Sequence, residues 1–333
     1  MRVLLIKTSS LGDVIHTLPA LTDAAAAIPG IQFDWVVEEG FAEIPAWHPA
    51  VAEVIPVAIR RWRKNLLATW KSGEWAGFKR RLREGRYDLV IDAQGLLKSA
   101  WLTRYVSAPV AGLDRDSARE PLASRFYDRR YAVPKDQHAL ERVRQLFAKA
   151  LGYTLPSGTG DYGLNRTAMM DAPAQPYLVF LHGTTWASKH WPEADWRALA
   201  EHLDARGVAV RLPWGSEAEK ARAERLVEGL AHAQVLPKLN LRGVAAVIAG
   251  ARACVAVDTG LGHLAAALDV PSISLYGPTL PVKVGAYGRG QIHLCATGPL
   301  AGGGDRDKPC FDGLDAARVA PELDRLLASL ETR

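Results

Sequence analysis

The sequence opens with Met1-Arg-Val-Leu-Leu-Ile-Lys-Thr-Ser-Ser-Leu-Gly-Asp13, in which a short apolar run leads into a polar loop. Apolar runs of this kind alternate with amphipathic segments along the whole chain, which is typical of a parallel β-sheet covered by helices. We therefore predict an α/β protein whose first strand ends just before this loop. Ligands bind at the carboxyl edge of doubly wound sheets, so the loop is a candidate site.

Ten apolar runs predict strands, and each half of the chain has the pattern of its own doubly wound unit. The predicted strands lie at residues 3–6, 33–37, 54–57, 89–92, 110–113, 177–182, 208–213, 235–236, 254–257 and 272–276. Helical patterns separate them, for example at residues 139–151, 194–205, 217–230 and 241–249, and a further helix closes the chain at about 314–330.

The length of 333 residues favours two domains over one core. Residues 155–160 and 171–176 are rich in Pro, Gly and small residues, as domain edges tend to be. We predict an N-terminal domain over residues 1–160, a C-terminal domain over 171–313 and a final helix over 314–333, which follows a polar, Gly-rich stretch at 301–308. Such a helix could cross back to the first domain. The cleft between two domains is a natural place for a site.

Composition limits the classes of partner. The net charge of +5 suggests contact with an anion such as nucleic acid, acidic lipid or phosphorylated sugar. The absence of zinc-finger, helix-turn-helix and RNP patterns makes nucleic acid the weakest of the three.

The cysteines Cys254, Cys295 and Cys310 lack the paired spacing of thiolate metal sites, which fits a reduced compartment. No apolar run is long enough for a secretory signal or a membrane span. We expect a soluble cytosolic protein, or one attached to a membrane surface.

Asp13 is the first candidate for chemistry. The loop from Lys7 to Asp13 lacks the G-x-G-x-x-G fingerprint, which argues against a nicotinamide or flavin dehydrogenase. A carboxylate within hydrogen-bond reach of a substrate hydroxyl can act as a general base. Asp is also a common N-cap residue, so Asp13 could simply cap the following helix.

Two loops in the second half have the composition of a phosphate site. The strand at 177–182 leads into Gly183-Thr-Thr-Trp-Ala-Ser-Lys189-His-Trp-Pro192, whose hydroxyls and lysine suit a departing diphosphate. The strand at 254–257 leads into Asp258-Thr-Gly-Leu-Gly-His263, where helix-terminal amides attract phosphate and Asp258 can bind sugar hydroxyls. Each residue also has a simpler interpretation: Lys189 as a solvated lysine, Asp258 as a cap and His263 as a buried side chain. Together the three loops favour a nucleotide-sugar cleft.

Residues 60–83 interleave basic and aromatic residues. Cations beside Trp and Phe suit an anionic membrane interface or a phosphorylated lipid, whereas a strongly charged solvated helix is the simpler alternative. Four cations, Arg60, Arg61, Arg63 and Lys64, occur within five residues. Lys98 and Arg119 could add anion contacts at the edge of the first domain, or could be ordinary surface charges.

Together these segments resemble the heptosyltransferase I family of lipopolysaccharide synthesis, within glycosyltransferase family 9. The resemblance covers residues 1 to about 290 and rests on the following segments: Lys7-Thr-Ser-Ser-Leu-Gly-Asp13, Phe33-Asp-Trp-Val-Val-Glu-Glu-Gly, Ile59-Arg-Arg-Trp-Arg-Lys64, Asp92-Ala-Gln-Gly, Ala118-Arg-Glu-Pro-Leu-Ala-Ser, Lys189-His-Trp-Pro and Val257-Asp-Thr-Gly-Leu-Gly-His263. It implies a GT-B fold, with two Rossmann-like doubly wound domains facing across a cleft. It also implies inverting transfer of L-glycero-D-manno-heptose from ADP-heptose to Kdo of Kdo2-lipid A.

The resemblance further implies roles for individual residues. Asp13 is the base that deprotonates the Kdo hydroxyl, and Lys189 assists departure of ADP. The donor-binding residues are Thr184, Thr185, Lys189, Glu219, Leu239, Asp258, Thr259, Gly260 and His263. The acceptor-binding residues are Arg60, Arg61, Arg63, Lys64, Lys98 and Arg119. No metal or cofactor is expected, and the protein is expected on the cytoplasmic face of the cell inner membrane as a peripheral protein, without nucleic acid.

The chain departs from the family pattern at Trp186-Ala-Ser188, where charged residues are expected, and after about residue 296. Three alternatives remain open. Another family 9 heptosyltransferase would use the same donor on a different core sugar, and a sugar-nucleotide epimerase would share the fold without needing a basic acceptor surface. The third alternative is a binding module without catalysis.

Overall fold

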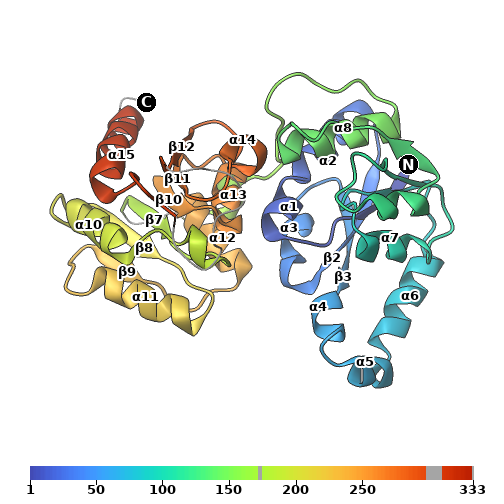
Figure 1. Ribbon diagram of the computed structural model, residues 1–333, viewed down its shortest axis with the longest axis horizontal. Helices are drawn as coiled ribbons and strands as arrows, with labels where there is room; N and C mark the ends of the chain where they lie inside the picture. Colours follow the sequence, from blue (N-terminus) through green and yellow to red (C-terminus); the bar gives the residue numbers. More distant parts are fainter. Residues whose placement is uncertain (172–174, 298–309, 332–333) are drawn as a thin grey trace. The chain divides into compact units, whose positions relative to one another are not determined.

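The computed structural model describes residues 1–171, 175–297 and 310–331, so the Gly-rich stretch predicted at 301–308 and part of the segment at 171–176 lie outside the described residues. The chain forms two compact units, Met1–Leu164 and Asn165–Arg333 (Figure 1).

The first unit is built on a six-stranded parallel sheet in the order β3-β2-β1-β4-β5-β6. Its strands are β1 (Arg2–Ile6), β2 (Gln32–Glu38), β3 (Val51–Val57), β4 (Leu89–Asp92), β5 (Val110–Leu113) and β6 (Arg129–Tyr131). The central strands are near-continuous apolar runs because helices cover both faces of a parallel sheet. Leu4, Ile6 and Val90 accordingly belong to the buried core.

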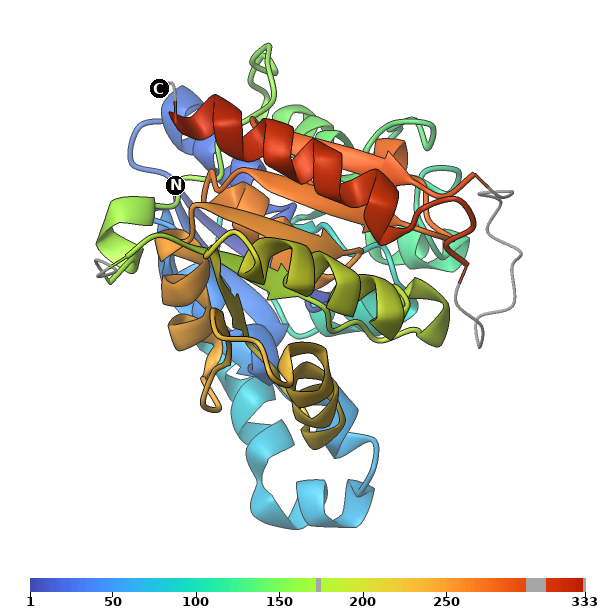
Figure 2. The ribbon, with the colours of Figure 1, turned by 90° about the vertical axis from the view of Figure 1, so that its left-hand side faces the viewer.

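Helices connect these strands and cover the sheet (Figure 1). They are α1 (Leu11–Ile15), α2 (Leu18–Ala27), α3 (Glu43–Ala46), α4 (Ile59–Trp62), α5 (Leu66–Ser72), α6 (Glu74–Glu84), α7 (Leu97–Thr103) and α8 (Ala139–Leu151), with short 3₁₀ helices η1 (Glu39–Phe41) and η2 (Pro121–Phe126). Helices α4, α5 and α6 form an arm that projects from the rest of this unit, with α5 at its tip (Figure 2).

The second unit repeats this architecture with the strand order β12-β11-β10-β7-β8-β9. Its strands are β7 (Tyr177–Leu181), β8 (Ala209–Leu212), β9 (Ala233–Val235), β10 (Ala253–Val257), β11 (Ser272–Tyr276) and β12 (Gln291–Cys295). Its helices are α9 (Arg166–Met169), η3 (Ala187–Lys189), α10 (Glu193–Asp204), α11 (Glu217–Val227), α12 (Leu241–Gly250), α13 (Gly260–Ala267), α14 (Pro281–Val284) and α15 (Ala316–Glu331).

Both sheets have the Rossmann strand order, which sets the position of a site in each unit. In the first sheet β1 lies between β2 and β4, and in the second β7 lies between β8 and β10. At these points the connections that leave two adjacent strands run toward opposite sides of the sheet, which opens a crevice at the carboxyl ends of the two strands. The loops after β1 and β4, and after β7 and β10, therefore lie at the binding edges.

The ten predicted strands are all present, which confirms the prediction of two doubly wound units. The prediction missed β6 and β12, the outermost strands on one side of each sheet. An edge strand has one free side and needs no continuous apolar run. In β6, Arg129 and Arg130 are exposed, so this segment has no strand-like apolar pattern.

The final helix α15 packs within the second unit, where Val319 and Leu323 join the core of the β7 sheet. It runs beside α10 (Figure 2). The indole Nε1 of Trp191 donates to the Leu314 carbonyl at 2.6 Å, and Asp195 accepts from the Ala316 amide at 3.0 Å. These bonds hold the start of α15 on the unit that also contains β7.

Candidate active site

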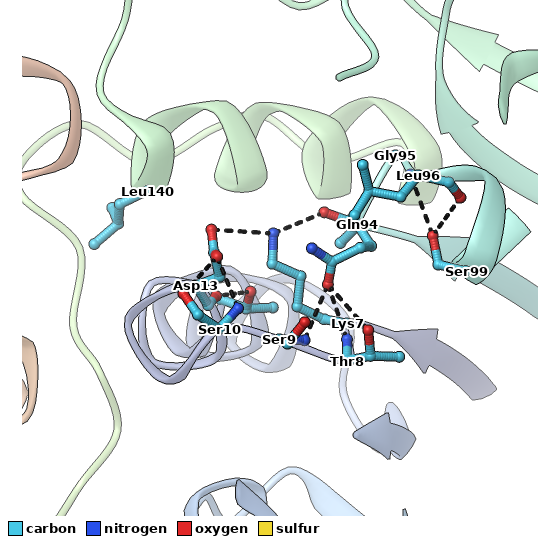
Figure 3. Close-up of polar contacts among 12 residues, drawn as sticks. Lys7, Thr8, Ser9, Ser10, Asp13, Gln94, Gly95, Leu96, Ser99 and Leu140 are labelled. Atoms are coloured by element: carbon cyan, nitrogen blue, oxygen red, sulfur yellow. Dashed lines mark hydrogen bonds and ion pairs between the residues drawn. The ribbon is translucent and has the colours of Figure 1, made fainter. Parts of the chain in front are cut away.

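The loop after β1 places a buried lysine behind Asp13. Lys7 Nζ donates to the Ala93 carbonyl at 3.0 Å and lies 3.9 Å from Asp13 Oδ1 (Figure 3). The Lys7 side chain is 8% exposed, whereas that of Asp13 is 34% exposed. Asp13 can therefore meet a substrate while Lys7 remains behind it.

Asp13 lies inside α1 rather than at its N-cap, which is Ser10. Its Oδ2 accepts from the Ser10 amide at 2.8 Å and from Ser10 Oγ at 2.9 Å, as in a capping box. The interpretation of Asp13 as the cap residue is therefore wrong in detail, although its carboxylate does help to cap the helix. Oδ1, which faces Lys7, has no hydrogen bond among those found for the described residues.

Electrostatics keep Asp13 ionised. Burial raises the pKa of its carboxyl, but the charge of Lys7 and the two hydrogen bonds from Ser10 together outweigh burial, and Arg119 adds to them. The pKa therefore lies below its ordinary value of 3.8. At neutral pH Asp13 is a carboxylate that can accept a proton.

Gln94, which follows the neighbouring strand β4, holds the loop after β1 in place by hydrogen bonds. Its Oε1 accepts from the amides of Thr8 at 2.9 Å and Ser9 at 3.1 Å (Figure 3). Asp92 in turn accepts from the Gln94 amide at 2.9 Å. No role was predicted for Gln94 or Lys7, since only the parallel pairing of β1 with β4 brings residues 86 positions apart together.

Replacement of Lys7 by methionine is expected to move the acid limb of the pH profile upward. A general base works only when ionised, so with Asp13 in that role we expect activity to fall as pH drops through the pKa of Asp13. That pKa lies below 3.8 with Lys7 present, and burial raises it once the lysine charge is gone. Measuring kcat/KM from about pH 4 to 8 checks this. An acid limb at the wild-type position in a folded Lys7→Met protein would contradict the coupling.

Three of the predicted acceptor cations lie near this loop. Lys98 Nζ donates to Ser9 Oγ at 3.2 Å. Burial lowers the pKa of Lys98, and nearby Arg60 and Arg119 lower it further. Glu38 and Glu120 raise the pKa of Lys98 but do not outweigh these effects. Arg119 also contributes to lowering the pKa of Asp13, so the charges of Lys98 and Asp13 both feel this arginine.

Arg61, Arg63 and Lys64 lie on the arm, as Arg60 also does. Arg61 contacts Glu39 at 3.0 Å and Glu74 at 2.8 Å, so two carboxylates already balance its charge. Arg63 and Lys64 are exposed. Arg61 is exposed as well, but its charge is already balanced, so Arg63 and Lys64 are better placed to meet an anionic ligand.

In the second unit, Lys189 and Asp258 form a close ion pair. Lys189 Nζ lies 2.6 Å from Asp258 Oδ2, which also accepts from Thr279 Oγ1 at 2.8 Å. The ammonium lies 4.5 Å from the centre of the Trp186 ring. Its side chain is 17% exposed, so Lys189 is not a freely solvated lysine. No role was predicted for Thr279, which follows β11.

The N-terminus of α13 adjoins this pair. Thr184 Oγ1 donates to the Asp258 carbonyl at 3.1 Å, which joins the loops after β7 and β10. Thr259 is the N-cap and Gly260 the first residue of α13, whose amides are suited to phosphate oxygens. His263 Nε2 lies 3.8 Å from Asp258 Oδ1. Thr185 is exposed beside these groups.

Glu219 and Leu239 lie on the neighbouring elements. Glu219 Oε2 accepts from the Gly215 amide at 2.7 Å and belongs to the capping box of α11. A Cβ on Gly183 would lie 2.6 Å from Glu219 Oε1, so glycine permits the close approach of the β7 loop to α11. Leu239 is half-buried and precedes Asn240, the N-cap of α12. The structure thus places the predicted donor residues on consecutive loops of one sheet edge.

Comparison with known proteins identifies the family. The model of "Glycosyltransferase family 9 (heptosyltransferase)" matches residues 75–309. This chain belongs to glycosyltransferase family 9. It is 67% identical to lipopolysaccharide heptosyltransferase 1 of Pseudomonas aeruginosa, in an alignment that covers 100% of this chain and 99% of that protein. The family predicted from the motifs is confirmed, and the chain is a glycosyltransferase.

Two solved structures of a heptosyltransferase match the fold of this chain. The Escherichia coli heptosyltransferase WaaC with ADP matches at a TM-score of 0.90 and 51% identity, covering 98% of this chain and 100% of that one. The same enzyme with ADP-2-deoxy-2-fluoro heptose matches at a TM-score of 0.87 and 51% identity, covering 98% and 99%. The predicted GT-B fold, with two Rossmann-like domains, is confirmed.

Two kinds of feature are absent from the described residues. No helix there combines the length and apolar character needed to cross a membrane. In the same ranges, no group of three or more His, Cys, Asp or Glu side chains is arranged to hold a metal ion.

Proposed function

We propose that this protein transfers L-glycero-D-manno-heptose from ADP-heptose to a Kdo sugar of Kdo2-lipid A, in assembly of the lipopolysaccharide inner core. The observation that carries the proposal is the pair of chemically distinct sheet edges, an ionised carboxylate on one unit and a cation beside a helix N-terminus on the other. The relatives' names and the ligands of the matching structures support the donor.

The proposed reaction is a single displacement that inverts the anomeric carbon. Asp13 removes the proton from the acceptor hydroxyl, and that oxygen forms a bond to the anomeric carbon. The bond from this carbon to ADP breaks, and its electron pair leaves with the diphosphate. Lys189 and the first amides of α13 stabilise the developing charge, without a metal ion.

Residues of the second unit would supply the contacts to the donor. Thr184, Thr185, Thr259 and Gly260 offer hydroxyls and amides to the diphosphate. We assign Asp258 and His263 to the sugar, and Glu219 and Leu239 to the ribose and adenine. Asp258 would then exchange part of its contact with Lys189 for contact with the bound donor.

Residues of the first unit would supply the contacts to the acceptor. Lys98 and Arg119, near Asp13, would hold the carboxylates of Kdo, and Arg60, Arg61, Arg63 and Lys64 would meet phosphates. Exposed cations beside exposed apolar side chains such as Leu67 also suit an anionic bilayer. We therefore place the protein on the cytoplasmic face of the inner membrane, as a peripheral protein that binds no nucleic acid.

A two-substrate assay tests the proposal. The protein is incubated with ADP-heptose alone, with Kdo2-lipid A alone and with both, and products are measured by mass spectrometry. We expect a heptosylated lipid and ADP only when both are present. Conversion of the donor alone would identify an epimerase. Transfer to a core acceptor that already carries heptose, but not to Kdo2-lipid A, would identify the related heptosyltransferase instead.

A further inference from the structure

Trp186 is an exposed aromatic residue in the loop after β7, beside Lys189. It is 41% exposed and opens the segment Trp186-Ala-Ser188, where the chain departs from the family pattern. The Lys189 ammonium lies 4.5 Å from the centre of its ring. A cation within about 6 Å of the face of an indole is attracted to the negative charge of that face. Trp186 therefore has a specific partner, and that partner is a candidate for binding the donor diphosphate.

A short 3₁₀ turn brings these two side chains together. Trp186 is the N-cap of η3, and the Lys189 amide donates to the Trp186 carbonyl at 3.0 Å. Side chains three residues apart lie above one another in a 3₁₀ helix, because it has three residues per turn. Ser188 is buried, which seats the turn against the second unit. The spacing from Trp186 to Lys189 thus places the ring and the ammonium on the same side of the loop.

Asp258 holds the same ammonium from another element. Its Oδ2 lies 2.6 Å from Lys189 Nζ, and it directly precedes Thr259, the N-cap of α13. The carboxylate takes one of the three N–H groups of the ammonium, whereas the attraction to the ring is electrostatic and needs no acceptor atom. Two contacts thus fix the nitrogen, while N–H donors stay available for phosphate oxygens at the start of α13.

The ring also limits contact between the ammonium and water. The Lys189 side chain is only 17% exposed, although it lies in a loop. A charge acts more strongly on a neighbouring anion where less water screens it. A ring that covers the ammonium would therefore strengthen its attraction for a diphosphate as well as direct it.

We propose that Trp186 is a positioning residue for the donor diphosphate, which acts through Lys189 by holding its ammonium beside the N-terminus of α13. The proposal rests on the proposed function, because it takes Lys189 to contact the diphosphate. One alternative is a ring that contacts the sugar or the nucleobase itself, and another is a ring that only helps the loop to fold. In both alternatives the ring would act whether or not Lys189 is present.

A double-mutant cycle measures whether the ring acts through the ammonium. The Kd for ADP is measured by calorimetry for the wild type, Trp186→Leu, Lys189→Met and the double variant. We expect Trp186→Leu alone to raise the Kd by about 3- to 30-fold, which corresponds to the usual strength of a cation–π contact. In the Lys189→Met background we expect no further change. An equal loss in both backgrounds, or an unchanged Kd in either single variant, would overturn the proposal.

Trp186→Phe separates attraction by the ring from packing. Phenylalanine keeps an aromatic face, although a weaker one, whereas leucine keeps only apolar bulk. We expect the Kd for ADP in Trp186→Phe to lie between those of the wild type and Trp186→Leu. Because Trp186 is exposed, thermal unfolding should be nearly unchanged in both variants. Equal losses of affinity in the two variants would show that the face of the ring contributes nothing, and the proposal would fail.

Trp101→Leu is the matched control. Trp101 is 46% exposed, and Arg104 lies 4.6 Å from the centre of its ring, so this substitution removes a similar pair from the first unit. We expect a wild-type Kd for ADP. If Trp101→Leu weakened ADP binding as much as Trp186→Leu does, the loss would not be specific to the donor loop, which would contradict the proposal.

The cycle needs no acceptor, so its outcome is separate from the test of heptose transfer. If the two-substrate assay yields no heptosylated lipid but the losses of ADP affinity are non-additive as expected, the acceptor assignment fails and the role of Trp186 stands. If heptose is transferred but the two losses of affinity simply add, the proposed function stands and the role of Trp186 fails.

Discussion

Asp13→Asn is expected to lower kcat by about 10²- to 10⁴-fold, the usual loss when a well-placed general base is removed. The amide has nearly the same shape and can still accept from Ser10, so the helix start should persist. It cannot accept the acceptor proton at neutral pH. Steady-state rates of ADP release at saturating substrates measure this loss.

Donor affinity distinguishes a catalytic loss from a folding loss. Asp13 and the donor residues lie on different units, so calorimetry should give a wild-type Kd for ADP in Asp13→Asn. Asp116→Asn, which alters an exposed carboxylate of the first unit, is the matched control and should keep its activity. A wild-type kcat in Asp13→Asn would remove Asp13 from its role.

Lys189→Met is the second substitution with a large expected effect. We expect it to lower kcat by about 10²- to 10³-fold, which corresponds to a loss of roughly 3 to 4 kcal/mol of transition-state stabilisation. The ammonium is largely shielded from water and held by Asp258 at 2.6 Å, so its charge acts on the leaving diphosphate with little screening by solvent. Methionine keeps the length and apolar contacts of the side chain. Single-turnover rates, measured with the enzyme in excess over ADP-heptose, isolate the step at which ADP leaves.

The control replaces a lysine of the same unit that makes no such pair. Lys283 is exposed on α14, and Lys283→Met should retain the wild-type rate. Loss of Lys189 also leaves the buried carboxylate of Asp258 without its ammonium partner, so thermal unfolding of each variant should be recorded. A folded Lys189→Met protein with normal single-turnover rates would show that the helix N-terminus alone supports the leaving group.

Local pattern was enough to predict most of the fold. The strand at Leu89–Asp92 and the helix at Ala139–Leu151 were predicted to the residue, because a buried parallel strand and an amphipathic helix both have strong apolar periodicity. The edge strands β6 and β12 were missed because exposed polar residues, such as Arg129 and His293, interrupt their apolar patterns. The docking of α15 on α10 was likewise not evident, since an apolar helix face does not specify its partner.

For the candidate site, the sequence by itself determined which loops lie at the carboxyl edge of each sheet, since polar residues directly after the strands of a parallel sheet lie there. Asp13, Lys189 and Asp258 were proposed as site residues in this way. Only the tertiary structure showed that Lys7 lies behind Asp13, that Gln94 braces the same loop and that Thr279 joins Lys189 on Asp258. These contacts join loops from different strands, and the strand order that brings the loops together depends on packing of the whole sheet, which no local pattern encodes.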